Sequence, residues 1–264
     1  SGDRVLIEAL PTMGKSYGAV KAAAETGEQI TVLTGRGREE QYSQIQEWCD
    51  EHGLDVYTLP SFARDCDTAN GEHGEDWKQT VMDWYHRGAT PQQIHKSAEY
   101  HLGEPLPCQR HEGGSCPYAS LWNFDPDEFD VLLGHYTHGY KQKVTSGRTV
   151  VFDESPDAYE HELGATKRAV SYWLSTVDGV PFEDYTDLVE HRDDQARRGE
   201  ALLWFDEHGV EPDESHVFED PHARADAPLA VYSLLAGEDL GNGFERARVD
   251  DDTGTRVVYD RETT

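Results

Sequence analysis

The sequence lacks any run of about 18 consecutive apolar residues, the length that a membrane-spanning helix needs. It also lacks a visible signal peptide, because Ser1-Gly2-Asp3 leads directly into a strand-like segment. Only four cysteines occur among the 264 residues, which argues against a disulfide framework of the kind that stabilises small secreted domains. From these absences we expect a cytoplasmic protein that does not contact a membrane.

Lysine and arginine are scarce: 23 of them stand against 52 acidic residues, and the formal net charge is −29. A negative surface repels nucleic acid, whose phosphates proteins normally contact through Lys and Arg. The acids are, however, dispersed along the chain, as in Asp125–Glu128 and Asp250–Asp252, rather than gathered in one tail. Dispersed acidity with little lysine is typical of the salt-adapted proteins of haloarchaea and their viruses, where concentrated salt screens the repulsion between charges. On this interpretation the net charge says little about the partner.

Short apolar runs alternate with helix-forming stretches in the first part of the chain and again before residue 155. Strands that alternate with helices at such spacings indicate βαβ units, an α/β fold and a mainly parallel sheet. Gly53 is a good candidate for the residue that ends the second helix. We expect strands over residues 4–9, 29–34, 55–59, 129–134 and 148–154, and helices over residues 16–26 and 38–52.

The alternation is interrupted in the middle of the chain, where three of the four cysteines and several Gly- and His-rich turns occur. We interpret this stretch as an insertion that projects from the sheet. A long, largely helical region follows the last strand of the sheet. The expected organisation is a nucleotide-binding core over residues 1–59 and 127–155, a cysteine-containing insertion over 60–126, a helical insertion or subdomain over 156–250, and a return strand of the core within 251–264.

A phosphate-binding turn is expected where the first strand meets the first helix. Backbone N–H groups and the helix N-terminus point at an anion there, and a glycine lets the backbone approach it closely. Lys15 supplies a compact cation for the β- and γ-phosphates, and the Ser16 hydroxyl supplies a ligand for Mg²⁺. The match to the pattern G-x-x-x-x-G-K-[ST] is imperfect, because Ala9 occupies the first glycine position. The residues expected to bind ATP are Pro11, Thr12, Met13, Gly14, Lys15 and Ser16.

A second motif, Asp153-Glu154, ends the apolar strand over residues 148–154. The carboxyl ends of strands form the ligand crevice in doubly wound sheets. Asp153 is expected to hold Mg²⁺ together with Ser16, and Glu154 is expected to orient or activate the attacking water. The predicted catalytic residues are therefore Lys15, Asp153 and Glu154.

With both motifs in this order, the sequence resembles the first RecA-like domain of superfamily 2 (DEAD/DEAH-like) helicases. The segment Asp153–Pro156 stands at the position of their Asp-Glu box. Thr34, Gly35 and Arg36 stand at the strand end that contacts the nucleic-acid backbone in this family. The segment Leu133–Tyr136 is similar to a segment of the iron–sulfur helicases related to XPD and DinG.

The resemblance covers residues 4–155 and implies a RecA-like fold that hydrolyses ATP with Mg²⁺. It also implies unwinding of nucleic acid or translocation along it, with DNA favoured over RNA. The second RecA-like domain of the family is not recognisable here, so we expect the chain to be one part of a longer protein. The region beyond residue 160 carries no motif that matches the family.

The iron–sulfur helicases carry a cysteine-bearing insertion before the Asp-Glu box, and Cys66, Cys108 and Cys116 lie in the corresponding interval. A [4Fe–4S] cluster normally takes four thiolates. The remaining cysteine, Cys49, falls on the apolar face of a predicted helix, where a buried free thiol is the simpler explanation. His111 or His73 would instead complete a Cys₃His zinc site. An iron–sulfur cluster, zinc and the absence of a metal all stay open at this point.

Two other functions also stay open. One is a P-loop kinase that acts on a small molecule, and the other is a non-catalytic, metal-stabilised module that binds nucleic acid. Lys141, Lys143 and Arg148 form the densest local basic cluster of the chain. These three residues would either face a nucleic-acid strand or pair with neighbouring acids.

Overall fold

The structure is a computed structural model of the chain. It describes residues 14–35, 39–111, 113–153, 166–241, 243–248 and 256–260. The strand predicted over residues 4–9 lies outside these ranges. The chain divides into two compact units: the first is Ser1–Cys66 with Cys116–Glu162, and the second is Asp67–Ser115 with Leu163–Thr264.

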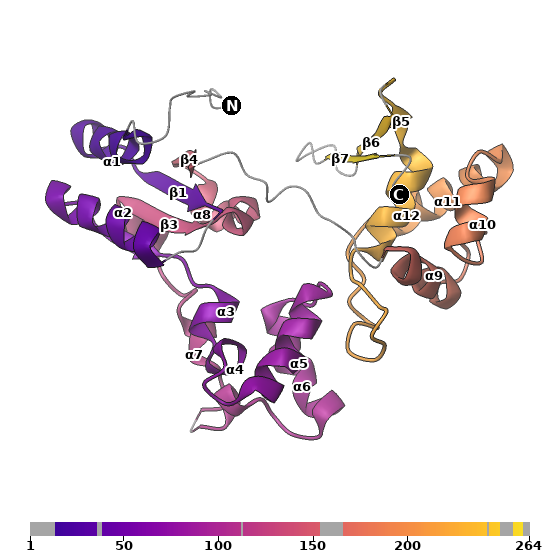
Figure 1. Ribbon diagram of the computed structural model, residues 1–264, viewed down its shortest axis with the longest axis horizontal. Helices are drawn as coiled ribbons and strands as arrows, with labels where there is room; N and C mark the ends of the chain where they lie inside the picture. The colour runs from indigo at the N-terminus through magenta and orange to yellow at the C-terminus, as the bar shows by residue number, and fades with distance from the viewer. Residues whose placement is uncertain are drawn as a thin grey trace. The chain divides into compact units, whose positions relative to one another are not determined.

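The first unit contains a four-stranded, all-parallel sheet with the order β2-β3-β1-β4 (Figure 1). Parallel neighbours need long connections between them, and the α-helices and longer segments of the chain supply these connections. The predicted α/β class and the parallel sheet are confirmed, and the arrangement is compatible with a RecA-like fold. The strands are β1 (Ile30–Thr34), β2 (Val56–Thr58), β3 (Val131–His135) and β4 (Thr149–Asp153).

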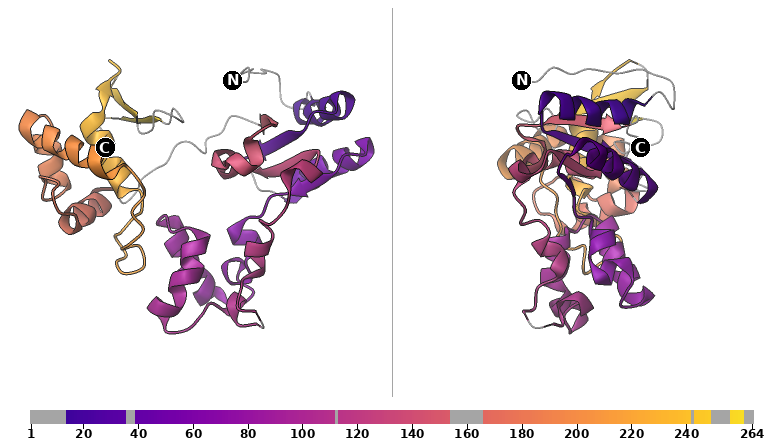
Figure 2. Two further views of the ribbon diagram at one scale, coloured as in Figure 1. Left: turned by 180° about the vertical axis from the view of Figure 1, so that it is seen from behind. Right: turned by 90° about the vertical axis from the view of Figure 1, so that its left-hand side faces the viewer.

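Helices flank both faces of this sheet. α1 (Lys15–Thr26) and α2 (Glu39–His52) lie side by side on one face (Figures 1 and 2), and both end at a glycine with positive φ. The other face is covered by η3 (Tyr136–Tyr140) and α8 (Gln142–Thr145), with Val144 packed against Leu132. Every residue of β1 is buried, so its apolar sequence suits a strand that is covered on both sides. The core under α1 and α2 comprises Val20, Ala23, Ile30, Val32, Tyr42, Ile45, Cys49, Val131 and Leu133.

Three short helical segments complete the first unit: α3 (Phe62–Asp65), α7 (Pro117–Ser120) and η2 (Pro126–Glu128). The aromatic rings of Phe62 on α3 and Tyr118 on α7 meet edge to face, with 5.8 Å between their centroids. Both side chains are buried. This contact holds the segments before and after residues 67–115 together.

The second unit is mainly helical and contains a small antiparallel sheet in the order β5-β6-β7. A core around Trp173, Phe205 and Val231 joins its C-terminal helices. The Arg87 guanidinium donates hydrogen bonds to the carbonyls of Val217 and Asp220, and so ties the cysteine-containing segment to the later part of the unit. The elements are α4 (Asp67–Asn70), α5 (Glu75–His86), α6 (Pro91–Leu102), η1 (Pro107–Gln109), α9 (Thr166–Thr176), α10 (Tyr185–His191), α11 (Gln195–His208), α12 (Ala227–Ala236), β5 (Glu238–Asp239), β6 (Phe244–Arg248) and β7 (Arg256–Asp260).

Two parts of the predicted organisation differ from the structure. The insertion was placed at residues 60–126, but the part that leaves the first unit is Asp67–Ser115, because the residues on either side pack with the parallel sheet's own unit. The predicted return strand of the core is wrong. A strand does form within 251–264, but β7 pairs antiparallel with β6, its neighbour along the chain, and not with the parallel sheet.

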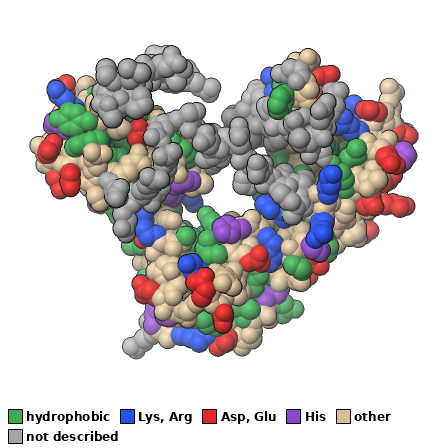
Figure 3. Space-filling model, in the orientation of Figure 1, with side chains coloured by type: hydrophobic (Ala, Val, Ile, Leu, Met, Phe, Trp, Pro, Cys, Tyr) green, Lys and Arg blue, Asp and Glu red, His purple; other side chains and the backbone are tan. Residues whose placement is uncertain are grey.

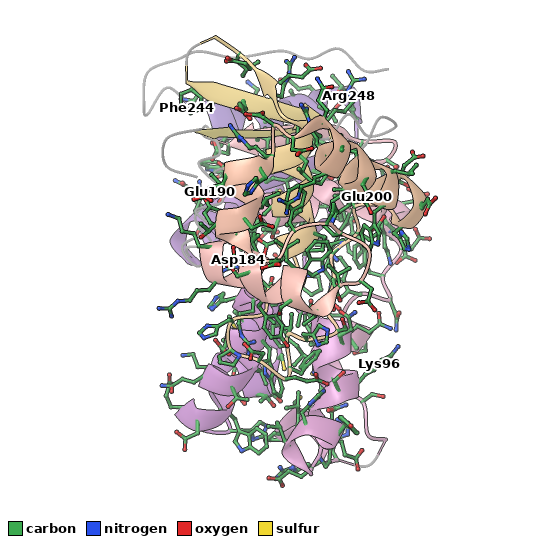
Figure 4. The ribbon with its side chains drawn as sticks, turned by 90° about the vertical axis from the view of Figure 1, so that its right-hand side faces the viewer. Lys96, Asp184, Glu190, Glu200, Phe244 and Arg248 are labelled. Carbon is green, nitrogen blue, oxygen red and sulfur yellow. The ribbon has the colours of Figure 1, made fainter. Side chains whose placement is uncertain are left out.

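Acidic side chains are spread over the face shown in Figure 3 and are interspersed with Lys and Arg. On the helices of the second unit, Asp184, Glu190 and Glu200 are exposed, as Figure 4 shows from another side. This distribution agrees with the dispersed acidity of the sequence. Within the described ranges, no helix combines the length and apolar character that crossing a bilayer requires.

Candidate nucleotide site and metal centre

The carboxyl edge of the parallel sheet brings together the ends of three neighbouring strands. Thr34 of β1 lies in register with His135 of β3 on one side and with Asp153 of β4 on the other. Asp153 is largely buried, with 9% of its surface exposed. In open α/β sheets this edge is where ligands bind.

Ser16 and Asp153, the two residues predicted to share a Mg²⁺ ion, are in direct contact. The Ser16 hydroxyl donates a hydrogen bond to Oδ1 of Asp153 at 2.8 Å, across 137 positions of sequence. Gly14 precedes α1 in the left-handed conformation, with φ of 71°, a conformation that glycine adopts without strain. Lys15 is the first residue of the helix. The predicted Pro11, Thr12, Met13 and Glu154 lie outside the described residues.

Gln41, in the first turns of α2, belongs to the same network and was not predicted. Its side-chain amide donates to Oδ2 of Asp153 at 3.0 Å, and its carbonyl oxygen accepts a hydrogen bond from the Thr34 hydroxyl at 3.2 Å. Both oxygens of the Asp153 carboxylate therefore have donors, one from α1 and one from α2. Nothing in the sequence distinguished Gln41 from the other glutamines of its helix, because its partner lies 112 positions away.

The segment predicted to contact nucleic acid is packed against the strand ends. Thr34 is 1% exposed, so its side chain serves the Asp153 network rather than facing solvent. A Cβ atom at Gly35 would overlap the Tyr136 ring, which explains the glycine without reference to a ligand. The Tyr136 hydroxyl donates to the main-chain carbonyl of Asp153. Arg36, the third predicted contact, lies outside the described residues.

The basic cluster near β4 makes contacts within the first unit, where Lys141 and Lys143 are exposed and Arg148 is half-buried. Arg148 donates hydrogen bonds to four main-chain carbonyls, those of Ile30, Pro126, Phe129 and Asp130. The ammonium groups of Lys141 and Lys143 lie 4.5 Å from the ring centroids of Trp122 and Phe124, respectively. These cations contact aromatic rings and carbonyls, and Arg148 also interacts electrostatically with Asp127 and Asp130.

The three cysteines of the predicted metal site gather with a histidine. One ligand atom from each of Cys66, His95, Cys108 and Cys116 lies within 4.8 Å of the other three. Sγ of Cys116 is 3.7 Å from Sγ of Cys66, and Sγ of Cys108 is 3.5 Å from Nε2 of His95. All three cysteines are buried and none is in a disulfide. A Cys₃His cluster with these separations can hold a metal ion.

Each ligand is positioned by a short local structure. Cys66 ends α3, Cys108 lies in η1, and Cys116 is the residue that precedes α7. The main-chain N–H of Cys108 donates to the buried hydroxyl of Thr68 at 3.1 Å. A metal site therefore rests on segments that come close together only in the folded chain.

His95 lies on α6, one turn after the start of the helix. Its Nδ1 is 2.6 Å from the carbonyl of Pro91, a distance that requires a proton on Nδ1. Nε2 faces Cys108, and in the neutral ring it would be the unprotonated nitrogen, which is suited to bind a metal. A backbone carbonyl that orients a histidine in this way is a common partner of metal-binding imidazoles.

The fourth ligand corrects the sequence prediction. His73 and His111 were the candidates, but the described group contains His95 and neither of these. Cys49 is fully buried in the core beneath α1 and α2, as the simpler explanation required, and burial raises the pKa of its thiol to about 11. His95 lies between Cys66 and Cys108 in the sequence, but no local pattern set it apart from the other histidines there.

Comparisons of the chain with protein-family models, with curated proteins and with solved structures gave no match.

Proposed function

We propose that this chain is the nucleotide-binding domain of an enzyme that hydrolyses ATP with Mg²⁺. The observation that carries the proposal is the 2.8 Å hydrogen bond from the Ser16 hydroxyl to Asp153. A helix N-terminus that follows a left-handed glycine lies beside an acidic strand end at the carboxyl edge of a parallel sheet. These are the parts that a phosphate and its metal ion require.

The roles of the side chains follow from their chemistry. Bound Mg²⁺ neutralises phosphate charge and makes the γ-phosphoryl group easier to transfer. Ser16 and Asp153 would hold that ion, and Lys15 would contact the β- and γ-phosphates. Glu154 follows Asp153 in the chain and would orient the attacking water.

The nucleic-acid part of the proposal rests on the order of the motifs and on their resemblance to superfamily 2 helicases. We propose ATP-dependent unwinding of nucleic acid, or translocation along it, with DNA favoured over RNA. A second RecA-like domain of a longer chain would supply the arginine that stabilises transition-state charge. A small-molecule kinase, in contrast, would have its turnover stimulated by a metabolite and not by DNA.

Replacing Lys15 tests the nucleotide site. Lys15→Ala should weaken ATP binding at least about tenfold, because the substitution removes a cation from the phosphates. The matched control is Lys21→Ala on the same helix, where Lys21 is exposed and pairs with Glu25. Equal ATP affinity in the wild type, the Lys15 variant and the Lys21 variant, measured in high salt, would remove the basis of the proposal.

We also propose that the Cys₃His cluster binds one Zn²⁺ ion. A tetrahedral ion with Zn–S bonds of about 2.3 Å places its ligand atoms about 3.8 Å apart. Two of the separations, 3.7 Å between two sulfurs and 3.5 Å between sulfur and nitrogen, are close to this value, and all of them are within 4.8 Å. Burial of the cysteines and the carbonyl behind His95 also suit a structural site.

The geometry of the same residues favours zinc over a [4Fe–4S] cluster, which is the alternative. Such a cluster binds each of its four irons to a separate ligand, so the ligands surround a body much larger than one ion. Ligand atoms within 4.8 Å of one another leave no room for four irons and four sulfides. The fourth ligand is also an imidazole rather than a thiolate.

Metal analysis tests the zinc proposal. Protein purified without oxygen should be colourless and contain one Zn²⁺ per chain, and His95→Ala should lose most of the metal. His73→Ala and His111→Ala are the controls, since both residues are exposed and lie outside the cluster. Iron in place of zinc, or full zinc content in the His95 variant, would contradict the assignment.

A further inference from the structure

Asp153 has a second partner besides Ser16, and that partner leads to the end of β1. Gln41 donates from Nε2 to Oδ2 of Asp153, and Thr34 donates from its hydroxyl to Oε1 of Gln41. The chain of contacts therefore runs from Ser16 through Asp153 and Gln41 to Thr34. Thr34 and Asp153 are also register partners in the sheet, so the side-chain path follows the backbone pairing at the same edge.

Gln41 contacts an acidic group, and in this it differs from Gln46, another glutamine of α2 that is anchored to a strand. Gln46 donates to the hydroxyl of Thr58, at the end of β2, at 2.9 Å. That contact fixes α2 to the sheet and involves no acidic group. Gln41 makes a similar tie to the sheet and, in addition, a hydrogen bond to the carboxylate proposed to hold Mg²⁺.

We propose that Gln41 is a positioning residue that fixes the orientation of the Asp153 carboxylate for Mg²⁺. This inference rests on the proposed function. A carboxylate turns readily about its last torsion, so its orientation depends on the donors that surround it. If Ser16 offered its oxygen to the ion, its hydroxyl would no longer restrain Oδ1, and Gln41 would be the donor that keeps Asp153 in place.

The chemistry of an amide suits this role. The Gln41 side chain carries no charge, so it does not repel the metal ion, and its NH₂ group is a donor only. Thr34 occupies the amide oxygen and thereby turns the NH₂ group toward Asp153. Gln41 thus also links the proposed Mg²⁺ site to the Thr34–Gly35 segment. The resemblance to helicases predicts that this segment contacts the nucleic-acid backbone.

The test compares ATP affinity with and without Mg²⁺ in the full chain. The probe is a fluorescent ATP analogue, titrated in Mg²⁺ and in EDTA. Gln41→Met keeps the length of the side chain and removes the donor. We expect this variant to lose roughly tenfold of the gain in affinity that Mg²⁺ provides, with affinity in EDTA unchanged. General damage to the fold would lower both affinities alike.

Gln46→Met is the matched control and should leave the Mg²⁺ dependence as in the wild type. Thr34→Val should shift the Mg²⁺ dependence in the same direction as Gln41→Met, and the double variant should add little, because both changes break one path. A Gln41→Met protein with the wild-type Mg²⁺ dependence would overturn the inference and leave the proposed function standing. A wild-type protein that does not bind the analogue would overturn both.

Discussion

At the scale of single residues, His138 has one of the most unusual environments in the described chain. Its ring is 6% exposed, its Nδ1 accepts the main-chain N–H of His135 at 3.0 Å, and its Nε2 lies 3.2 Å from the Pro60 carbonyl. These contacts suit a neutral ring with its proton on Nε2. Burial, and secondarily the nearby positive charge of Lys141, lower the pKa of His138 to about 4.

This pKa makes stability depend on pH in a defined window. In the unfolded chain the histidine takes up a proton near pH 6.5, whereas in the folded chain it stays neutral to about pH 4. The contribution of the neutral His138 to the free energy of unfolding is therefore complete above pH 6.5. It is lost as the pH falls toward 4, by at most about 3 kcal/mol. Urea unfolding between pH 4 and 7 should show a shallower pH dependence for His138→Gln than for the wild type. Equal slopes would show that His138 does not titrate in this way.

Asp187 makes the free energy of unfolding depend on pH in a different and more acidic range. Hydrogen bonds from Arg197, and next the main-chain N–H of Glu183, lower its pKa to about 2. The depressed pKa means that this stabilisation is present above the ordinary carboxyl pKa and is lost as the pH falls through about 2. The two residues therefore act in separate pH ranges, so the His138 window can be measured without interference from Asp187.

At the scale of helices and strands, local signals predicted much of the fold. Gly27 and Gly53 end α1 and α2 with positive φ, as residues that stop helices commonly do. The apolar runs of β1 and β3 identified buried strands, because a strand covered on both faces carries such a run. The apolar run of β4 identified a strand at the end of the described sheet, where only Asp153 is buried. These signals lie within a few residues of the elements that they define.

Contacts between distant segments could not be predicted in the same way. Gln41 meets Asp153 across 112 positions, and His95 joins the three cysteines only in the folded chain. Polar side chains of these types occur throughout an acidic sequence, so residue type alone does not select the partner. The prediction for β7 failed for a related reason. The strand was recognisable in the sequence, but its neighbour in the sheet, β6, was not.

The start of α6 provides a prediction at this scale. Thr90 caps the helix, Gln93 completes the capping box, and His95 follows within the next turn. Thr90→Ala should lower the free energy of unfolding by about 1 kcal/mol and weaken zinc retention, because the first turn holds His95 in place. Thr90→Ser keeps the hydroxyl and should behave as the wild type in urea unfolding and in competition with a zinc chelator. If Thr90→Ala retains both stability and zinc, the cap does not support the site.

At the scale of the whole molecule, arginines act mainly as internal ties. Arg87, Arg148 and Arg197 each donate to main-chain carbonyls, and Arg197 also pairs with Asp187. In a chain with net charge −29, this use engages, within the described residues, cations that could otherwise contact phosphates. Binding to nucleic acid would then depend on backbone N–H groups and a few residues, and its salt dependence would be shallow.

The metal and nucleotide proposals concern separate residues and can be tested separately. The proposed zinc site comprises Cys66, His95, Cys108 and Cys116, whereas the Ser16–Asp153 contact belongs to the carboxyl edge of the parallel sheet. Removal of zinc should therefore lower the free energy of unfolding more than it weakens nucleotide binding. Loss of the Asp153 carboxylate should affect nucleotide binding with little change in metal content.

The central claim is that Ser16 and Asp153 hold the Mg²⁺ ion of bound ATP. Calorimetric titration of ATP into the wild-type protein and into Asp153→Asn, with Mg²⁺ or with EDTA at high salt, tests it most directly. We predict that Mg²⁺ strengthens wild-type binding about tenfold or more and that Asp153→Asn loses this gain, because the variant lacks the charge that attracts the ion. Absence of ATP binding by the wild type, or an equal effect of Mg²⁺ on both proteins, would contradict the account.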